Sequence, residues 1–194
     1  MRIGIYGGSF DPIHYGHLLL AESAREQLNL DKVFFVPAAI APHKRGQESA
    51  PAPARIEMLK LAISGNAALE VSPLEIDRGG VSYTVDTLTA LRDAHPEAEL
   101  TLLVGGDTLA DMPNWKAPEQ IVQIARVAVV DRPGASFEQI VLPGAEILHV
   151  SMPLIDLSSR EIRNRVARGE SIRYWLPRAV EQYILHSNLY AQDA

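Results

Sequence analysis

Residues 7–17 read Gly-Gly-Ser-Phe-Asp-Pro-Ile-His-Tyr-Gly-His, and this stretch decides how the chain folds around it. It follows a short apolar run, Ile3–Tyr6, and precedes an apolar-rich segment, Leu18–Leu28. A glycine-rich turn between a strand and a helix is where α/β proteins bind phosphate groups. The turn contains two histidines, His14 and His17, and does not have the G-x-G-x-x-G pattern of a dinucleotide fold. The pattern predicts a site that acts on a phosphate as well as binding it.

Short apolar runs alternate with helical segments along the rest of the chain. The expected strands are Ile3–Tyr6, Val33–Val36, Leu69–Ile76, Leu100–Val104, Val127–Val130 and Ile147–Val150. The expected helices are Leu18–Leu28, Pro53–Ser64, Tyr83–Ala94, Pro118–Ile124 and Phe137–Leu142. This alternation predicts an α/β fold, a Rossmann-like doubly wound parallel sheet with helices on both faces. Ligands bind such sheets beyond the carboxyl ends of the strands, where both 7–17 and 105–107 lie.

Length and composition limit the class of protein. The 194 residues are expected to form one domain, with 177–194 as a closing C-terminal helical segment that begins at Pro177. The formal net charge of −6 argues against a nucleic-acid partner, which usually meets a basic face. The chain has no cysteine, so it has no disulfide or thiolate metal site, which fits a cytoplasmic protein. No apolar run approaches the ~18 residues of a membrane span.

A second phosphate motif follows the last expected strand. Ser158 and Glu161 form an S-x-x-E capping box, which predicts a helix to about Arg168 with Gly169 as its stop. The simpler interpretation is an ordinary cap with solvated arginines. The alternative is a phosphate cradle, because serines, free amide groups and the guanidinium groups of Arg160 and Arg163 meet at one helix start. Taken with His14, His17 and Lys44, this motif indicates a polyphosphate such as a nucleoside triphosphate.

With both motifs considered, the chain resembles the nucleotidyltransferase superfamily that carries the H-x-G-H signature. More narrowly, it resembles the family of bacterial nicotinate-mononucleotide adenylyltransferases. The matching motifs span nearly the whole chain: 7–17, Pro42-His43-Lys44, Ser82-Tyr83-Thr84-x-Asp86-Thr87, Gly105-Gly106-Asp107, Asn114-Trp115 and Ser158-Ser159-Arg160-x-Ile162-Arg163. Two positions depart from the pattern. Lys116 stands where many relatives have an aromatic residue or histidine, and Arg160 replaces a commoner small residue.

The resemblance implies that ATP and nicotinate mononucleotide give nicotinate adenine dinucleotide and pyrophosphate, a step of NAD biosynthesis. The acceptor phosphate would attack the α-phosphorus of ATP in line, without a covalent enzyme intermediate. The implied catalytic residues are His14, His17, Lys44 and Arg163. The implied ATP-binding residues are Gly7, Gly8, Ser9, Phe10, His14, His17, Gly105, Asp107, Ser158, Ser159, Arg160 and Arg163. Mg²⁺ would bridge the phosphates with few protein ligands, and Asp11 would tie the turn together.

The acceptor side is also assigned through the resemblance. The implied contacts to nicotinate mononucleotide are Ser82, Tyr83, Thr84, Thr87, Trp115, Lys116 and Arg132. The segment 82–87 is expected to start a helix, whose exposed amide groups favour the carboxylate of nicotinate over the amide of nicotinamide. Trp115 would stack on the pyridine ring, and Arg132 would reach the mononucleotide phosphate.

Other functions remain open at this point. The nearest is a sister enzyme that uses nicotinamide mononucleotide or phosphopantetheine as phosphate acceptor. A non-catalytic nucleotide-binding regulator is another, although both histidines are present. A fragment of a class I aminoacyl-tRNA synthetase shares the H-x-G-H logic, but the acidic charge argues against it.

Overall fold

The computed structural model describes residues 1–42, 49–131 and 143–191. Six strands form one sheet in the order β3-β2-β1-β4-β5-β6, and every neighbouring pair is parallel. The strands are β1 (Arg2–Gly8), β2 (Lys32–Pro37), β3 (Leu69–Val71), β4 (Glu99–Gly105), β5 (Arg126–Asp131) and β6 (Ile147–Ser151). This strand order is the Rossmann order, so the predicted fold is confirmed.

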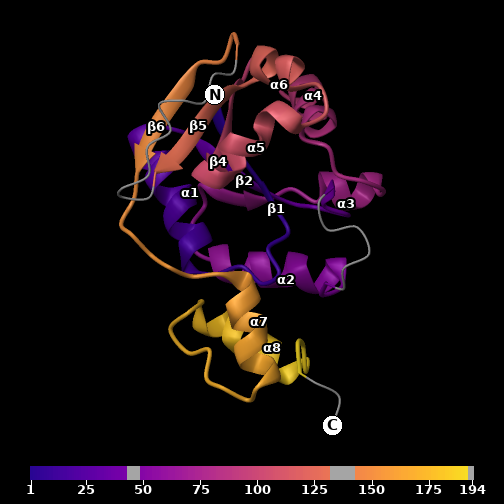
Figure 1. Ribbon diagram of the computed structural model, residues 1–194, viewed down its shortest axis with the longest axis vertical. Coiled ribbons are helices and arrows are strands. Elements are labelled where there is room, and N and C mark those ends of the chain that lie inside the picture. The colour runs from indigo at the N-terminus through magenta and orange to yellow at the C-terminus, as the bar shows by residue number, and fades with distance from the viewer. Residues whose placement is uncertain (43–48, 132–142, 192–194) are drawn as a thin grey trace.

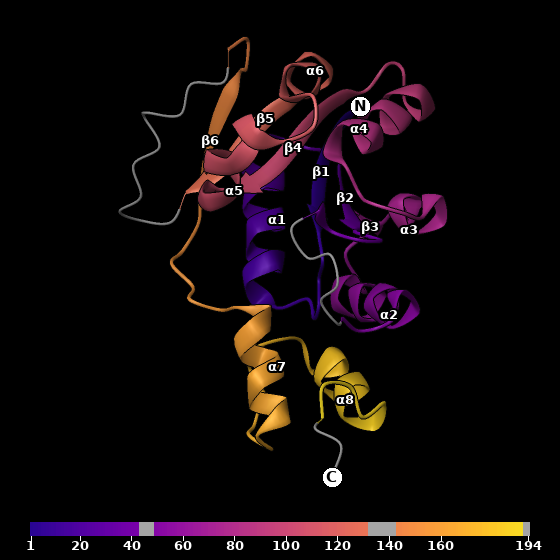
Figure 2. The same ribbon diagram turned by 45° about the vertical axis from the view of Figure 1, so that its right-hand side comes forward.

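Helices cover both faces of the sheet, and each face has its own hydrophobic core (Figure 1 and Figure 2). One face carries α1 (Tyr15–Gln27) and α2 (Ala52–Ile63). Below these two helices in both views lie α7 (Ser159–Ala167) and α8 (Arg178–His186), which join the same core. The other face carries α4 (Thr84–Ala94), α5 (Gly106–Asp111), the 3₁₀ turn η2 (Met112–Asn114) and α6 (Pro118–Ile124), with Leu74 of α3 (Leu74–Arg78) packed against them. Strand residues alternate between the two cores, because successive side chains point to opposite faces of a sheet. In β2, for example, Val33 and Phe35 join the first core, whereas Phe34 and Val36 join the second.

The central strand β1 brings the glycine-rich turn to the middle of one sheet edge. Ile5 of β1 is in register with Phe34 of β2 and with Leu102 of β4. Gly4 lets the side chain of Leu30 pack directly on β1, because a Cβ there would lie 2.8 Å from Leu30 Cδ1. In the strand order the chain proceeds outward from β1 in one direction to β2 and in the other to β4. The point between β1 and β4 is therefore the switch point at which such sheets bind ligands.

Several predicted elements differ from the observed ones. The expected strand Leu69–Ile76 is wrong beyond Val71, because Pro73 is the N-cap of the short helix α3. A proline at this point fits a helix start better than a strand interior. The segment after β4 continues directly into α5, which was not predicted. The expected helix Phe137–Leu142 lies outside the described residues.

The predicted helix after the last strand has the expected ends. Ser158 caps α7, and its side chain accepts a hydrogen bond from the backbone N–H of Glu161 at 3.2 Å. The helix ends in a Schellman motif, with Gly169 at a φ of 69° and the N–H of Glu170 bonded to the carbonyl of Arg165. The second half of the capping box is replaced, because the Glu161 carboxylate pairs with Arg168 instead. Within the described residues, no helix has the length and apolar character needed to cross a membrane.

Replacing Thr101 by valine is expected to stabilise the fold. Thr101 lies in β4, is 0% exposed, and its hydroxyl has no hydrogen-bond partner within 1–42, 49–131 and 143–191. A buried hydroxyl without a partner loses its hydrogen bonds to water on folding and gains none in the protein. Its removal is therefore expected to raise the free energy of unfolding by about 1 kcal/mol. Urea denaturation of Thr101→Val and the wild type measures the difference.

Thr87 is the matched control, because its buried hydroxyl is hydrogen-bonded to Glu75 and Arg78. Thr87→Val is expected to lose about 1–3 kcal/mol of unfolding free energy, the opposite sign. A loss of stability in Thr101→Val would contradict the assignment of its hydroxyl as an unsatisfied group in the core.

Candidate active site

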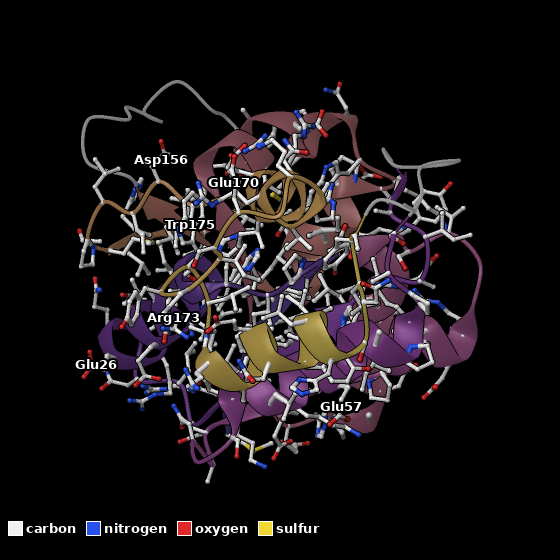
Figure 3. The ribbon with its side chains drawn as sticks, turned by 90° about the horizontal axis from the view of Figure 1, so that it is seen from below. Glu26, Glu57, Asp156, Glu170, Arg173 and Trp175 are labelled. Carbon is white, nitrogen blue, oxygen red and sulfur yellow. The ribbon has the colours of Figure 1, made fainter. Side chains whose placement is uncertain are left out.

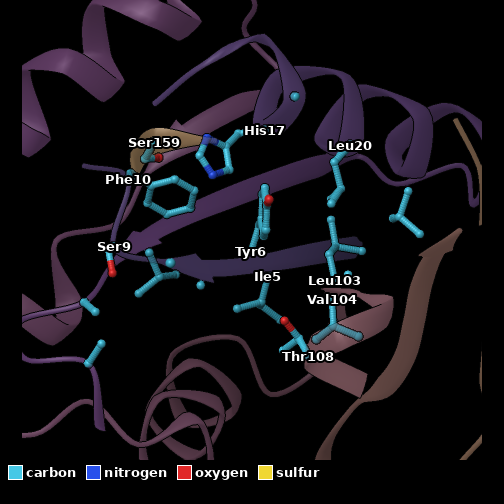
Figure 4. A pocket seen from close by; sticks show the side chains of 18 of the residues that line it. Ile5, Tyr6, Ser9, Phe10, His17, Leu20, Leu103, Val104, Thr108 and Ser159 are labelled. Carbon is cyan, nitrogen blue, oxygen red and sulfur yellow. The ribbon is translucent and has the colours of Figure 1, made fainter. Parts of the chain in front are cut away.

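The turn after β1 has an unusual backbone that an aromatic cluster supports. Phe10 has a φ of 46° and is only 2% exposed. Its ring contacts Tyr6 edge-on at a centroid distance of 5.3 Å and His17 at 5.2 Å. Figure 4 shows these rings together at one end of a cleft. The Phe10 ring thus packs against the His17 imidazole and holds it in place.

The two histidines are held by each other at the start of α1. Their rings stack with centroids 3.7 Å apart and an interplanar angle of 25°. The backbone N–H of His14 donates to Nδ1 of His17 at 3.2 Å. Because Nδ1 accepts this hydrogen bond, the neutral His17 ring carries its proton on Nε2. The donor that this ring can present to a ligand is therefore Nε2–H.

Gly16 leaves the space that the His14 ring occupies. A Cβ at position 16 would lie 3.1 Å from both Cε1 and Nδ1 of His14. The glycine of the H-x-G-H motif is thus required by a close approach between the first turn of α1 and the imidazole.

Helix α7 reaches across to the turn and joins the two phosphate motifs. The Ser159 hydroxyl donates to the carbonyl of Pro12 at 2.8 Å, and Nη1 of Arg163 donates to the carbonyl of Asp11 at 2.7 Å. Residues about 150 positions apart are therefore in direct contact, so the structure brings the two motifs together. These bonds also mean that Ser159 and Arg163 shape the turn itself.

Asp11 is the centre of a buried polar cluster behind the turn. Its carboxylate accepts hydrogen bonds from the Ala50 N–H at 3.1 Å and from the Tyr190 hydroxyl at 2.6 Å. Arg55 of α2, only 3% exposed, donates to the carbonyls of Ser9 and Ala50. Burial lowers the pKa of the Arg55 guanidinium, and the nearby Asp11 charge opposes that effect. Asp11 thus serves the structure of the turn, as its sequence context suggested.

The turn, α7 and the carboxyl ends of the central strands enclose a cleft of about 830 Å³. Figure 4 shows His17, Phe10 and Ser159 at one end of the close-up and Val104 and Thr108 at the other. Most of the sequence-predicted site residues line this cleft: Gly7, Gly8, Ser9, Phe10, His14, His17, Ser82, Thr84, Thr87, Gly105, Trp115, Ser158, Ser159, Arg160 and Arg163.

The residues near the start of α4 are bonded to the protein as well as facing the cleft. The Ser82 hydroxyl accepts a hydrogen bond from the Ala39 N–H at 2.9 Å. The Thr87 hydroxyl, 2% exposed, donates to Glu75 at 2.5 Å and accepts from Arg78 at 3.1 Å. These two side chains hold the wall of the cleft, whereas Thr84 at the first turn of α4 is only half-buried.

Two expected acceptor contacts, Tyr83 and Lys116, lie apart from the cleft lining. Lys116 bonds both carboxylate oxygens of Asp86 at 3.0 Å, and its ammonium group lies 4.7 Å from the centre of the Tyr83 ring. Their neighbour Trp115 does line the cleft, and it donates its indole N–H to Asp111 at 3.2 Å. Lys44, Arg132 and the side chain of Asp107 lie outside the described part of the chain.

Sequence reasoning missed three residues of this site. Glu75, a carboxylate only 6% exposed, lines the cleft beside Thr87. Arg55 and Tyr190 support the turn from behind. Arg55 carried a usable signal, because it shares a helix face with the apolar Met58 and Leu59. No group of three potential metal-ligating side chains occurs among the described residues.

Comparisons with known proteins agree with this geometry. Residues 5–165 match the cytidylyltransferase-like family. A probable nicotinate-nucleotide adenylyltransferase of Thermus thermophilus is 48% identical over 190 residues, covering 98% of this chain and all of the relative. A protein of the same description from Thermomicrobium roseum is 43% identical and covers 97% of this chain and 91% of the relative.

The fold has solved counterparts. A Plasmodium falciparum nicotinic acid mononucleotide adenylyltransferase complexed with NaAD superposes with a TM-score of 0.83 at 22% identity, covering 97% of each chain. A putative nicotinate-nucleotide adenylyltransferase of Vibrio parahaemolyticus gives a TM-score of 0.74 at 21% identity, covering 100% of this chain and 98% of the other. The chain belongs to the cytidylyltransferase-like nucleotidyltransferases and, within them, to the nicotinate-nucleotide adenylyltransferase family. The resemblance stated from the motifs is therefore confirmed.

Gly16→Ala is expected to slow nucleotidyl transfer by about tenfold or more, because the added Cβ displaces the His14 ring. The measurement is kcat for Gly16→Ala, His14→Ala and the double variant, with circular dichroism to check the fold. If position 16 acts through His14, the double variant is no slower than His14→Ala alone. Additive losses would contradict that coupling.

Proposed function

We propose that this chain transfers the adenylyl group of ATP to nicotinate mononucleotide, giving nicotinate adenine dinucleotide and pyrophosphate. Family membership supports the reaction class, and the relatives' names supply the acceptor. We further propose that this activity is cytoplasmic, in keeping with a chain that has no cysteine.

One observation carries the proposal: the histidine turn and the start of α7 open into a single cleft. The contacts Ser159–Pro12 and Arg163–Asp11 fix them against each other, and the ends of β1 and β4 form the floor. A triphosphate needs several donors from different directions, and this arrangement supplies them. The same cleft extends to Thr84 and Trp115, which leaves room for a second substrate beside the nucleotide.

The histidines would stabilise charge in the transition state. His17 presents Nε2–H, because its Nδ1 is already bonded to the backbone of His14. In-line attack by the acceptor phosphate on the α-phosphorus breaks the bond to the pyrophosphate leaving group and needs no enzyme nucleophile. A donor placed against the developing negative charge is worth ~3–4 kcal/mol of barrier. His14 would support the same charge from the other side of the stacked pair.

The remaining contacts to the nucleotide would come from three places around the cleft. Backbone groups at 7–9, at the end of β1, and at 105–107, at the start of α5, are proposed to contact the nucleotide. Ser158, Ser159 and the half-buried Arg163 would do so from the start of α7. Arg160 is exposed at the rim of the cleft and would meet the outer phosphates. Lys44 is proposed as a further cation from outside the described residues.

Mg²⁺ would accompany the triphosphate. Its preference for phosphate oxygens and retained waters suits a cleft whose end near the two phosphate motifs is lined by histidine, serine and arginine, with Glu75 as the carboxylate among its described lining residues. Bound there, it would neutralise charge on the β- and γ-phosphates.

The acceptor would lie toward α4. Free amide groups at the start of this helix favour an anion such as the nicotinate carboxylate. Trp115 is half-buried with its indole N–H fixed by Asp111, so its ring is oriented for stacking on the pyridine. Arg132 is proposed to meet the mononucleotide phosphate.

Glu75 is the observation that favours the alternative acceptor, nicotinamide mononucleotide. A buried carboxylate in the wall of this recess repels an acidic ring substituent. The Thr87 hydroxyl links Glu75 to Arg78 through two hydrogen bonds, and the positive charge of the Arg78 guanidinium offsets that of the carboxylate. The balance of these groups decides the preference between acid and amide.

Pyrophosphate release with ATP and Mg²⁺ tests the acceptor directly. We expect nicotinate mononucleotide to be preferred over nicotinamide mononucleotide by about 100-fold in kcat/KM. The reason is that the negative carboxylate is attracted to the backbone amide groups at the start of α4, whereas the neutral amide is not. Equal rates would discard the helix-start argument. Turnover with neither would direct attention to other phosphate acceptors.

His17→Ala is expected to reduce kcat by roughly 10²–10³ while the KM of the acceptor changes little, because the lost donor acts on the transition state. Steady-state kinetics with a thermal-unfolding control measures this. A reduction of less than about tenfold would remove His17 from the catalytic residues.

A further inference from the structure

We propose that Tyr190, near the end of the chain, is a positioning residue for the nucleotidyl-transfer site, because its hydroxyl fixes Asp11 and with it the turn that carries His14. The hydroxyl donates to Oδ1 of Asp11 at 2.6 Å, across a separation of 179 residues. Tyr190 is not among the described residues that line the cleft, so it acts through the turn and not on the reacting atoms.

The end of α8 directs Tyr190 to this place. The helix ends in a Schellman motif, in which Leu189 N–H bonds the carbonyl of Ile184 and Asn188 N–H bonds that of Leu185. Asn188 takes the left-handed conformation that this motif needs, with a φ of 50°. Leu189 then packs against the core, and the chain turns back toward Asp11. The reversal is therefore built by local hydrogen bonds and not by the Tyr190–Asp11 contact itself.

The C-terminal segment is attached to the same turn at a second point. Seen from below, α8 lies along α2, and Trp175 lies in the connection before α8 (Figure 3). The carbonyl of Trp175 accepts a hydrogen bond from the N–H of Tyr15, the first residue of α1, at 3.3 Å. The segment thus bonds both sides of His14, at Asp11 and at Tyr15.

The two oxygens of the Asp11 carboxylate face different partners. Oδ1 accepts from Tyr190 and Ala50, whereas Oδ2 lies 3.9 Å from Nη1 of Arg163. Arg163 also donates to the Asp11 carbonyl. Without the Tyr190 hydroxyl, Oδ1 keeps only the hydrogen bond from Ala50, so the carboxylate is held less firmly and can move toward Arg163, which is the cation proposed to hold phosphate.

Tyr190 remains a donor at working pH. Burial and the adjacent Asp11 carboxylate raise the pKa of the Tyr190 hydroxyl well above its ordinary value, although the nearby cations Arg163 and Arg55 oppose this. A raised folded-state pKa leaves stability unaffected below the unfolded value near 10 and lowers it as pH rises further, because only the unfolded chain then releases the proton. The contribution of Tyr190 to this alkaline loss of stability should be absent from Tyr190→Phe.

The test compares Tyr190→Phe with Tyr183→Phe. Tyr183 lies in α8, is half-buried against the same core, and its hydroxyl bonds no residue of the described chain. Three quantities are measured for each protein: kcat for adenylyl transfer, affinity for α,β-methylene ATP by calorimetry, and Tm from about pH 8 to about pH 11. Assays are run well below Tm, and kcat is corrected for the folded fraction.

We expect Tyr190→Phe to lower kcat by about tenfold and to weaken the ATP analogue by about threefold or more, with the acceptor KM unchanged. Its Tm should fall less steeply than that of the wild type above about pH 10. Tyr183→Phe should match the wild type in kcat and analogue affinity.

Two results would overturn the proposal. One is a Tyr190→Phe enzyme whose corrected kcat and analogue affinity stay within twofold of the wild type. The other is a loss shared by both variants, which would make the hydroxyl merely one of many stabilising groups. The measurement of kcat for adenylyl transfer rests on the proposed function. If the wild type itself fails to adenylate nicotinate mononucleotide, that function fails, while the analogue-binding and Tm arms still test Tyr190.

Discussion

A buried carboxylate, that of Asp11, is the constraint on which the rest of the site depends. Water is excluded from it, so its charge must be met by donors and cations of the protein. These come from three separate parts of the chain: Ala50 and Arg55 at the start of α2, Arg163 of α7, and Tyr190 after α8. The geometry of the turn that carries the histidines therefore depends on contacts with all three segments. Its geometry is a property of the tertiary structure, although its chemistry resides in a short motif.

The sheet supplies the other half of the site. Because β1 and β4 are neighbours and their connections leave toward opposite faces, a gap opens between their carboxyl ends, and the cleft lies there. The histidine turn closes one side of this gap and α4 with Trp115 lies on the other. The strand order thus accounts for the position of the cleft, in which we propose that the two substrates bind side by side.

Local patterns predicted much of this from sequence. The glycine turn, the S-x-x-E cap and the apolar runs are short-range signals, and they predicted five of the strands and the helix at Ser159 nearly to the residue. Residues 72–76 were wrongly assigned to a strand, because their apolar side chains masked the helix start at Pro73. The hydroxyls of Ser159 and Thr87 were assigned to ligands, but both have protein partners that lie far away in sequence or on another element. Such pairings leave no trace in a single sequence.

Asp11 and Tyr190 also determine when the site is assembled. A hydrogen bond between residues 179 positions apart closes a loop that contains nearly the entire domain. Contacts of this kind form late, since the entropy of closing a long loop must be met before the contact contributes. The histidine motif is synthesised long before residue 190, so its turn gains the hydrogen bond to Tyr190 only after most of the domain has been made. The exact geometry of the turn is therefore completed late, although the motif itself is local in sequence.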